Sequence, residues 1–421
     1  MVLKRELNLL DATSIGIGAI IGAGIFVVLG VAIGYAGPAV ILSMVIAGIV
    51  ATFTALSFAE LSSAMPKEGG IYAFSYELIS PSAAFVVGSL WLFGQIFAGA
   101  AVSLGFAHYF LVLVPSFPLK IVAIFAALAF TLLNLIGIKG SAEFNNLLVL
   151  LKIAILGVFI FAGIPHMDGN NFIPFSPNGL FGIIQGAGVI FFAYLGLGRV
   201  AALGEEVKNP EKTLPLSIFL ALAISVLIYL LTGIVAIGLE GYDVLSGSGS
   251  PIAQAAAVTG SQLFVVLVSL GALMATSSVL LTNLIGLSRF SFAMARNRQL
   301  PQPLVKLHPA FGTPYISILV TGALTVLLVF FLDLRLTAVI TSFAILVTYF
   351  VLNYAAIMLR KKNPDLKTFR SPMHPAVPVL GMLSCLLLMV SLPPESWLAA
   401  AVVVAASICY YRLVLKKTGN K

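Results

Sequence analysis

The sequence predicts an all-α integral membrane protein with about twelve transmembrane helices. Of its 421 residues, 60% are hydrophobic and only 9% are charged, and the mean hydropathy is +1.10. A soluble domain carries roughly a quarter charged residues, so this composition excludes a water-soluble protein. The apolar residues are gathered into runs of about 20, the length of a helix that crosses the hydrocarbon core.

These runs predict the spans in chain order. They lie near residues 12–34, 38–64, 82–113, 119–138, 145–164, 179–202, 215–239, 260–295, 315–333, 336–359, 376–393 and 395–415. No run alternates apolar and polar residues with period two, which favours helices over a barrel. The start, MVLKRELNLL, is followed by no small-residue cleavage site, so we expect it to lead into a retained first helix. The gap at 66–81 predicts a short interfacial helix.

The charges predict how the chain sits in its membrane. The sequence has 23 Lys and Arg against 15 Asp and Glu, a formal net charge of +8. The basic residues fill short gaps between apolar runs, so we expect a lipid bilayer and no nucleic acid as partner. With the N-terminus inside, 20 of the 23 basic residues are cytoplasmic and only Lys120 and Arg335 are external. The sequence therefore predicts a multi-pass plasma-membrane protein with both termini in the cytoplasm.

Glycine clusters interrupt two of the spans. The first span contains Gly22-x-Gly24 and the sixth contains Gly196-x-Gly198, 174 residues further on. The two pairs occupy the same relative place in two blocks of five spans, which predicts an inverted repeat with broken helices one and six. The predicted parts are residues 1–164, residues 165–360, and two peripheral C-terminal helices at 361–421. Close packing of small residues between helices is the alternative reading of these glycines.

A broken helix has a chemistry of its own. The free N–H groups at the start of a half-helix, with its positive dipole end, suit a carboxylate. Carbonyl groups released by the unwinding accept hydrogen bonds from an ammonium group. Glycine allows both the unusual backbone and close approach of a ligand. A zwitterionic α-amino acid fits such a site without any charged side chain.

Lys152 lies about 10 Å inside the fifth span, at 1.5 Å per residue. An ionisable group at that depth is costly and points to a function. The alternative is that its long side chain extends back to the cytoplasmic interface.

Four motifs resemble one family. GIGAIIGAGIF, FAELSSAMPKEGGIYAFSYE, FFAYLGLGRVAALGEEVKNPEKTLP and SRFSFAMARNRQLP are similar to segments of amino acid permeases in the amino acid–polyamine–organocation (APC) superfamily. They occur in the family's order and cover residues from about 6 to 360. The resemblance implies a five-plus-five inverted-repeat fold, alternating access, and substrates that are amino acids or related amines.

The resemblance also implies a substrate site. The family's carboxylate contacts correspond to the N–H groups of Ala23 and Gly24, with Gly22 opening the turn. Its ammonium contacts correspond to carbonyls of Ile20, Phe192 and Leu195, and its aromatic walls and gate to Phe191, Phe192 and Tyr194. Members often have an acidic residue where this chain has Gly198, and a polar group where it has Ala193. We therefore expect small to medium neutral amino acids.

Some permeases that this chain resembles, among the prokaryotic proton-coupled members, have a lysine in the fifth helix where related transporters bind sodium. The resemblance therefore implies proton-coupled, sodium-independent transport through Lys152, with Thr276, Ser277 and Ser278 of the eighth span as its expected neighbours. Obligate exchange of amino acids is the alternative, and an amino-acid sensor on a transporter fold is an alternative of a different class.

Glu60, Arg199 and Glu205 are candidate gate residues at the inner ends of the spans. Ion pairs with Arg289, Arg296 or Arg298 would serve that purpose, although interfacial charges are as often simply solvated. No metal-binding spacing, nucleotide-binding motif or catalytic motif occurs, so we expect no cofactor, no metal and no enzymatic activity. The sequence predicts no particular oligomeric state.

Overall fold

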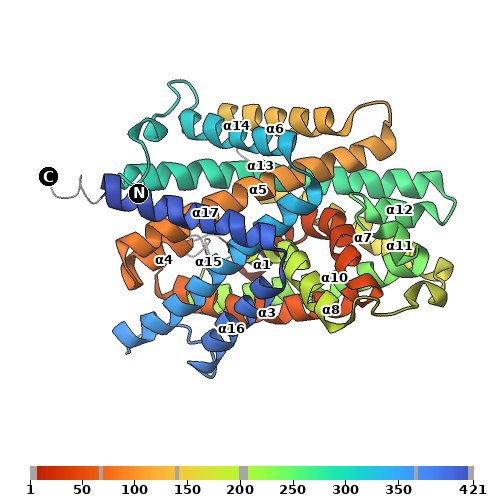
Figure 1. Cartoon of the computed structure of the whole chain (residues 1–421), viewed down its shortest axis with the longest axis horizontal. Helices are drawn as coiled ribbons and strands as arrows, with labels where there is room; N and C mark the ends of the chain where they lie inside the picture. The colour runs from red at the N-terminus through yellow and green to blue at the C-terminus, as the bar shows by residue number, and fades with distance from the viewer. Residues whose placement is uncertain (1–6, 66–69, 138–141, 199–206, 365–367, 416–421) are drawn as a thin grey trace.

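The computed structural model describes residues 7–65, 70–137, 142–198, 207–364 and 368–415. Throughout these ranges the chain is helical, without a strand (Figure 1). An isolated bridge joins Leu7 to Val207, and the Lys208 N–H donates to the Leu7 carbonyl at 2.9 Å. This contact ties the segment before the first helix to the segment that precedes residue 210.

The first predicted block folds into a broken helix followed by four longer ones. The broken helix comprises α1 (Leu9–Ile20), the π-helical turn η1 (Gly24–Val28) and α2 (Leu29–Ala36), and η2 (Gly37–Ala39) follows it. The others are α3 (Val40–Ala64), α5 (Pro81–Leu113), α6 (Leu119–Ile136) and α7 (Ala142–Gly163). The short helix α4 (Gly70–Leu78) confirms the helix expected between residues 66 and 81.

The second predicted block begins after the short turns η3 (Ile164–His166) and η4 (Gly169–Phe172). Its elements are α8 (Gly179–Ile190), η5 (Phe191–Tyr194), α10 (Pro210–Leu239), α11 (Tyr242–Leu245), α12 (Pro251–Ala257), α13 (Gln262–Arg296), η7 (Gln302–Val305), α14 (Tyr315–Phe331) and α15 (Leu334–Lys362). The chain then continues into α16 (Ala376–Ser391), α17 (Pro394–Tyr410) and the turn η8 (Tyr411–Leu415).

Helix length and composition fit a membrane protein. In the part of the chain that the structure describes, eight helical stretches are long and apolar enough to cross a bilayer, and three shorter apolar helices accompany them. Local sequence explains several helix starts. Asn8 and Asp11 form a reciprocal capping box at α1, Ser80 caps α5 before Pro81, and Asp333 caps α15.

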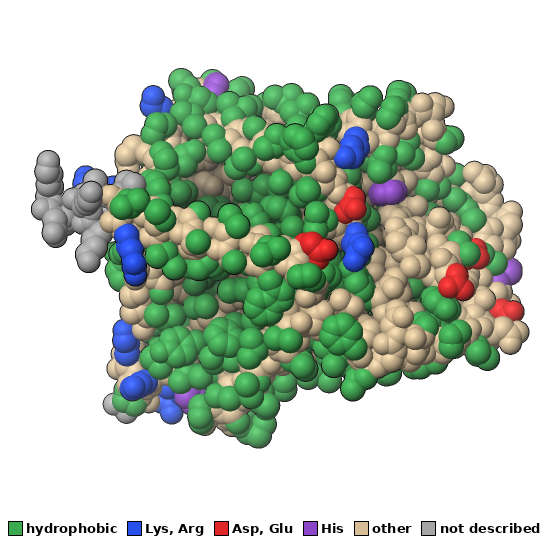
Figure 2. All heavy atoms as spheres, viewed as in Figure 1, with side chains coloured by type: hydrophobic (Ala, Val, Ile, Leu, Met, Phe, Trp, Pro, Cys, Tyr) green, Lys and Arg blue, Asp and Glu red, His purple; other side chains and the backbone are tan. Residues whose placement is uncertain are grey.

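The helices divide into a central group and a peripheral group. The broken helix is almost wholly buried and packs against α8, α10, α7 and η5. By contrast, α6 and α14 lie side by side at one edge (Figure 1) and expose large apolar side chains, including Phe125, Leu132 and Leu327. Such an apolar outer surface is stable only in lipid. On the face in Figure 2, Lys and Arg gather toward the end where α17 finishes, and the opposite end carries Asp and Glu.

Candidate substrate site

The first break lies between α1 and η1. The Ile21 N–H still donates to the Ile17 carbonyl at 2.7 Å, but the Ile21 ψ of 91° leaves the helical region. The chain bends at Ile21 and Gly22 and resumes as a π-helical turn at Gly24. Such wide turns are rare in helices and concentrate at functional sites. The helix expected from residue 12 to 34 is therefore interrupted near its middle.

The second break follows α8. After Ile190 the chain tightens into the 3-10 turn η5, and the Leu195 N–H donates to the Phe192 carbonyl at 3.3 Å. Residues 199–206, with the candidate gates Arg199 and Glu205, lie outside the described residues. The described part of the predicted sixth span is thus a helix of 12 residues that ends in a tight turn.

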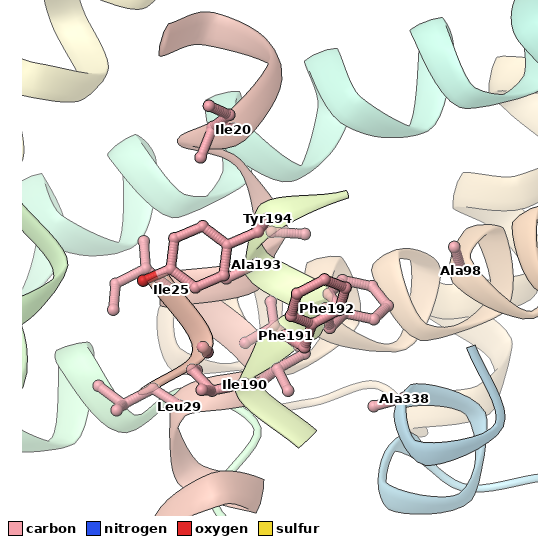
Figure 3. Close-up of a cluster of buried hydrophobic side chains, with 14 of the residues drawn as sticks. Ile20, Ile25, Leu29, Ala98, Ile190, Phe191, Phe192, Ala193, Tyr194 and Ala338 are labelled. Atoms are coloured by element: carbon pink, nitrogen blue, oxygen red, sulfur yellow. The ribbon is translucent and has the colours of Figure 1, made fainter. Parts of the chain in front are cut away.

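The two breaks touch each other through their backbones. A Cβ added to Gly24 would lie 2.3 Å from the Ala193 Cα, and one added to Gly196 would lie 2.1 Å from the Ala19 carbonyl oxygen. Figure 3 shows the segment from Ile190 to Tyr194 beside the interruption between Ile20 and Ile25. Gly24 and Gly196 are therefore required for close backbone approach. Close packing, the alternative reading of these glycines, therefore applies to Gly24 and Gly196, and both residues also lie at the helix breaks.

Tyr229 of α10 connects the two breaks. Its buried hydroxyl lies 2.6 Å from the Ile20 carbonyl oxygen and 3.1 Å from the Ala193 carbonyl oxygen. Sequence reasoning missed this residue. The available signal was a tyrosine in the middle of an apolar run, because a buried tyrosine hydroxyl usually finds a partner.

The carbonyl groups expected to bind an ammonium already accept hydrogen bonds within the protein. Ile20 accepts from Tyr229, Phe192 accepts from the Leu195 N–H, and Leu195 accepts from the Tyr349 hydroxyl at 3.4 Å. Each carbonyl oxygen has a second lone pair. A ligand could therefore bind them in addition to these partners.

The predicted aromatic walls belong to the same enclosed region. Phe191 meets the Tyr349 ring edge-on at 5.9 Å, and Tyr194 meets Tyr229 at 5.5 Å. The Tyr194 hydroxyl donates to the Met44 carbonyl at 3.2 Å. Phe192 is 4% exposed, and every residue from Ile20 to Val28 is buried. The structure thus has both breaks shielded from solvent, and access to them requires movement of surrounding elements.

Lys152 is buried in α7 beside the eighth span. Its side chain is 2% exposed, and its Nζ donates to the Ser278 Oγ of α13 at 2.6 Å. Ser278 also donates to its own backbone, at the Ala275 carbonyl, while Thr276 donates to the Ala272 carbonyl. Of the three expected neighbours, Ser278 is therefore the one hydrogen-bonded to Lys152. Because α7 also packs against α1, the ammonium lies in a helix that contacts both the broken helix and α13.

Glu60 has a different partner from those expected. Its carboxylate accepts from Arg360 at 2.5 and 3.2 Å and from the Ser371 N–H at 3.1 Å. Arg289, Arg296 and Arg298 do not supply this ion pair. Arg360 lies in the last turn of α15, so the contact joins the end of α3 to α15 and to the segment before α16. We call Glu60, Arg360 and Ser371 the inner latch.

A second contact lies at the opposite end of α15. The Arg335 Nε at the start of α15 donates to the Tyr35 hydroxyl at 2.7 Å, and its guanidinium lies 5.3 Å from the centre of the Tyr35 ring. The Tyr35 carbonyl accepts from Asn178, which precedes α8, at 2.8 Å. Tyr35 thereby links α2 and the start of α8 to α15. No sequence pattern predicted it.

Comparison with known proteins identifies the family. The family model described as amino acid permease matches residues 7–410. The methylthioribose transporter of Bacillus subtilis (strain 168) is 36% identical over 99% of this chain and 94% of its own length. The branched-chain amino acid permease BcaP of the same organism is 34% identical over 93% of this chain and 88% of its own. The cationic amino acid transporter 9, chloroplastic, of Arabidopsis thaliana is 33% identical over 73% of this chain and 58% of its own. The chain belongs to the amino acid permease family of the APC superfamily, whose members are multi-pass membrane transporters.

Proposed function

We propose that this protein is a secondary active transporter of small to medium neutral amino acids, driven by protons and independent of sodium. The observation that carries the proposal is the contact between the two helix breaks, with Lys152 buried in α7, which packs against α1 of the first broken helix. The proposed architecture is two inverted five-helix blocks with alternating access, two further helices, and both termini in the cytoplasm.

The substrate class follows from the lining of the breaks. The backbone from Gly22 to Gly24 begins a new helical segment, and its first N–H groups suit a carboxylate. The described residues that surround the breaks supply aromatic rings, aliphatic side chains and carbonyl groups. Positions 193 and 198 are Ala193 and Gly198, so neither supplies a carboxylate. A cationic side chain would have no counter-charge among these described residues. The similarity to a branched-chain amino acid permease supports the same class.

The position of Lys152 supports proton coupling. An ionisable side chain buried at this depth in a membrane helix is costly and points to a function. In the charged state its ammonium donates to Ser278 and holds α7 to α13. Loss of the proton weakens that contact and, through the packing of α7 on α1, changes the stability of the broken helix.

Uptake into proteoliposomes tests this proposal. We expect accumulation of a neutral amino acid under an inward proton gradient and none with a sodium gradient alone. Lys152→Ala should abolish the pH dependence, and Lys120→Ala, which changes an exposed lysine, should retain it. Uptake that needs sodium, or that remains pH-driven in Lys152→Ala, would overturn the coupling.

Three other functions have separate experimental outcomes. Counterflow that requires an internal amino acid load would indicate obligate exchange in place of net uptake. A relative at 36% identity is a methylthioribose transporter, so methylthioribose belongs in the substrate screen. It has neither the carboxylate nor the ammonium of an amino acid, and preference for it would contradict the proposed site. Binding of an amino acid without any transport would indicate a sensor.

A further inference from the structure

A groove of about 700 Å³ lies between α5, α15 and the end of α17. Its walls are mostly apolar and include Val86 and Val87 of α5, Val351 of α15 and Ile408 of α17. The groove is open on the outer surface of the helix bundle, and Ile408 at its edge is 40% exposed. In a membrane this surface faces lipid.

The polar residues of the groove all lie toward one end. Ser82 is in the first turn of α5, four residues before Val86. Tyr354 follows Val351 along α15, and Tyr411 and Arg412 follow Ile408 at the end of α17. This is the end at which α5 begins and at which α15 and α17 finish, the cytoplasmic end in the proposed orientation.

Further positive charge borders the same end. Lys361 follows Tyr354 by seven residues and therefore lies on the same face of α15. The Lys362 Nζ donates to the Glu77 carbonyl at 3.2 Å, two residues before Ile79 in the groove wall. Among the described residues, Glu77 is the acidic residue nearest in sequence to those that line the groove. The basic residues at this end, Arg412, Lys361 and Lys362, outnumber it three to one.

Aromatic contacts fix the shape of this end. Phe85 of α5 stacks on Tyr410 at 5.7 Å and contacts Tyr411 at 5.9 Å. These contacts hold η8, with Arg412, over the start of α5. The groove is therefore formed by packed elements and not by an unanchored terminus.

We propose that this groove binds an anionic phospholipid of the cytoplasmic leaflet. The acyl chains occupy the part lined by Val86, Val351 and Ile408, and the phosphate meets Arg412 and Lys361. Charge complementarity selects this occupant, because basic pockets between membrane helices at the cytoplasmic surface suit anionic headgroups. A second groove of about 380 Å³ between α5 and α6 is lined by Phe and aliphatic side chains alone, so it should bind acyl chains without headgroup preference.

Native mass spectrometry of the full chain tests the proposal. Purified protein is exposed to equal amounts of phosphatidylglycerol and phosphatidylcholine with identical acyl chains, and the lipid retained is counted. We expect wild-type protein to prefer phosphatidylglycerol. Arg412→Gln should lower its retention about fivefold, the factor typical of one basic residue at a membrane surface. Arg412→Lys should restore most of it.

Two further variants make the result specific. Ala83→Phe narrows the groove and should lower retention of both lipids, and a melting curve checks that this variant is folded. Lys306→Gln removes an exposed basic residue of the segment after α13 and should leave retention unchanged. Equal retention of the two lipids by wild type, or equal loss in Lys306→Gln and Arg412→Gln, would overturn the proposal.

Discussion

Gly24 is a residue whose missing side chain sets the distance between the two broken helices. Because an added Cβ would lie 2.3 Å from the Ala193 Cα, the clash is with backbone that cannot rotate away. We expect Gly24→Ala to destabilise the protein by about 1–3 kcal/mol, the usual cost of overpacking, and to abolish transport. Melting temperature and uptake measure the two effects.

Gly157→Ala is the matched control, since a Cβ at Gly157 of α7 would meet nothing within 4 Å. Alanine is the better helix former, so this variant should be as stable as wild type or slightly more stable. Normal transport by Gly24→Ala would mean that the two breaks do not pack as closely as described.

Tyr229 acts through a single hydroxyl. Tyr229→Phe keeps the ring and its contact with Tyr194 but leaves the Ile20 and Ala193 carbonyls without this donor. We expect a loss of about 1–3 kcal/mol, the cost of leaving a buried polar group unsatisfied, and a large fall in transport. Tyr354→Phe, at an exposed position of α15, serves as the control and should change neither the stability nor the transport rate. Unchanged uptake in Tyr229→Phe would show that the bridge is dispensable.

At the scale of elements, the inner latch is a contact between α3, α15 and the segment before α16. His374 lies beside it, and its buried Nε2 has no hydrogen-bond partner among the residues that the structure describes. Burial and the positive charge of Arg360 lower the pKa of His374 below its usual value of 6.5, while Glu60 opposes this shift. The folded protein therefore binds fewer protons at this residue than the unfolded chain does.

The lowered pKa of His374 sets the direction in which the stability of the protein changes with pH. The stability that a neutral His374 contributes is present above about pH 6.5 and is lost as the pH falls below it toward the folded-state pKa. We expect the melting temperature to fall between pH 7.5 and 5.5, and to fall less in His374→Gln. His166→Gln, in an exposed turn, serves as the control. An equal pH slope in His374→Gln and wild type would contradict the assignment.

The elements also show what the sequence could predict. Lengths of apolar runs located the helices, and the paired glycines Gly22-x-Gly24 and Gly196-x-Gly198 located the two breaks. A tyrosine in an apolar run marked Tyr229 as a residue that needs a hydrogen-bond partner, but its two carbonyl partners, the Arg360 partner of Glu60 and the Tyr35–Arg335 contact could not be predicted. Glu60 and Arg360 are 300 residues apart in the chain, and only the packing of α3 against α15 brings them together.

At the scale of the whole molecule, the uneven distribution of charge predicts its orientation. A single cysteine placed at Asn170, in the exposed turn η4, should react with a membrane-impermeant maleimide on intact cells. One at Lys306, in the segment after α13, should react only after permeabilisation. Cys409 is exposed and is first replaced by Ser, whereas Cys385 is buried. Labelling of position 306 on intact cells would reverse the proposed orientation, and with it the leaflet assigned to the lipid groove.

The most direct measurement is a binding assay on purified protein, in which unlabelled compounds compete with a labelled neutral amino acid. The competitors are the same amino acid, its amide, which lacks the carboxylate, and its N-acetyl derivative, which lacks the ammonium. Both derivatives keep the side chain. The contact between the two helix breaks predicts that the free amino acid competes and that each blocked form competes at least about tenfold less well, since each loses a charge-assisted hydrogen bond. Equal competition by the blocked forms, or by methylthioribose, would show that the breaks do not bind the two charges of an amino acid.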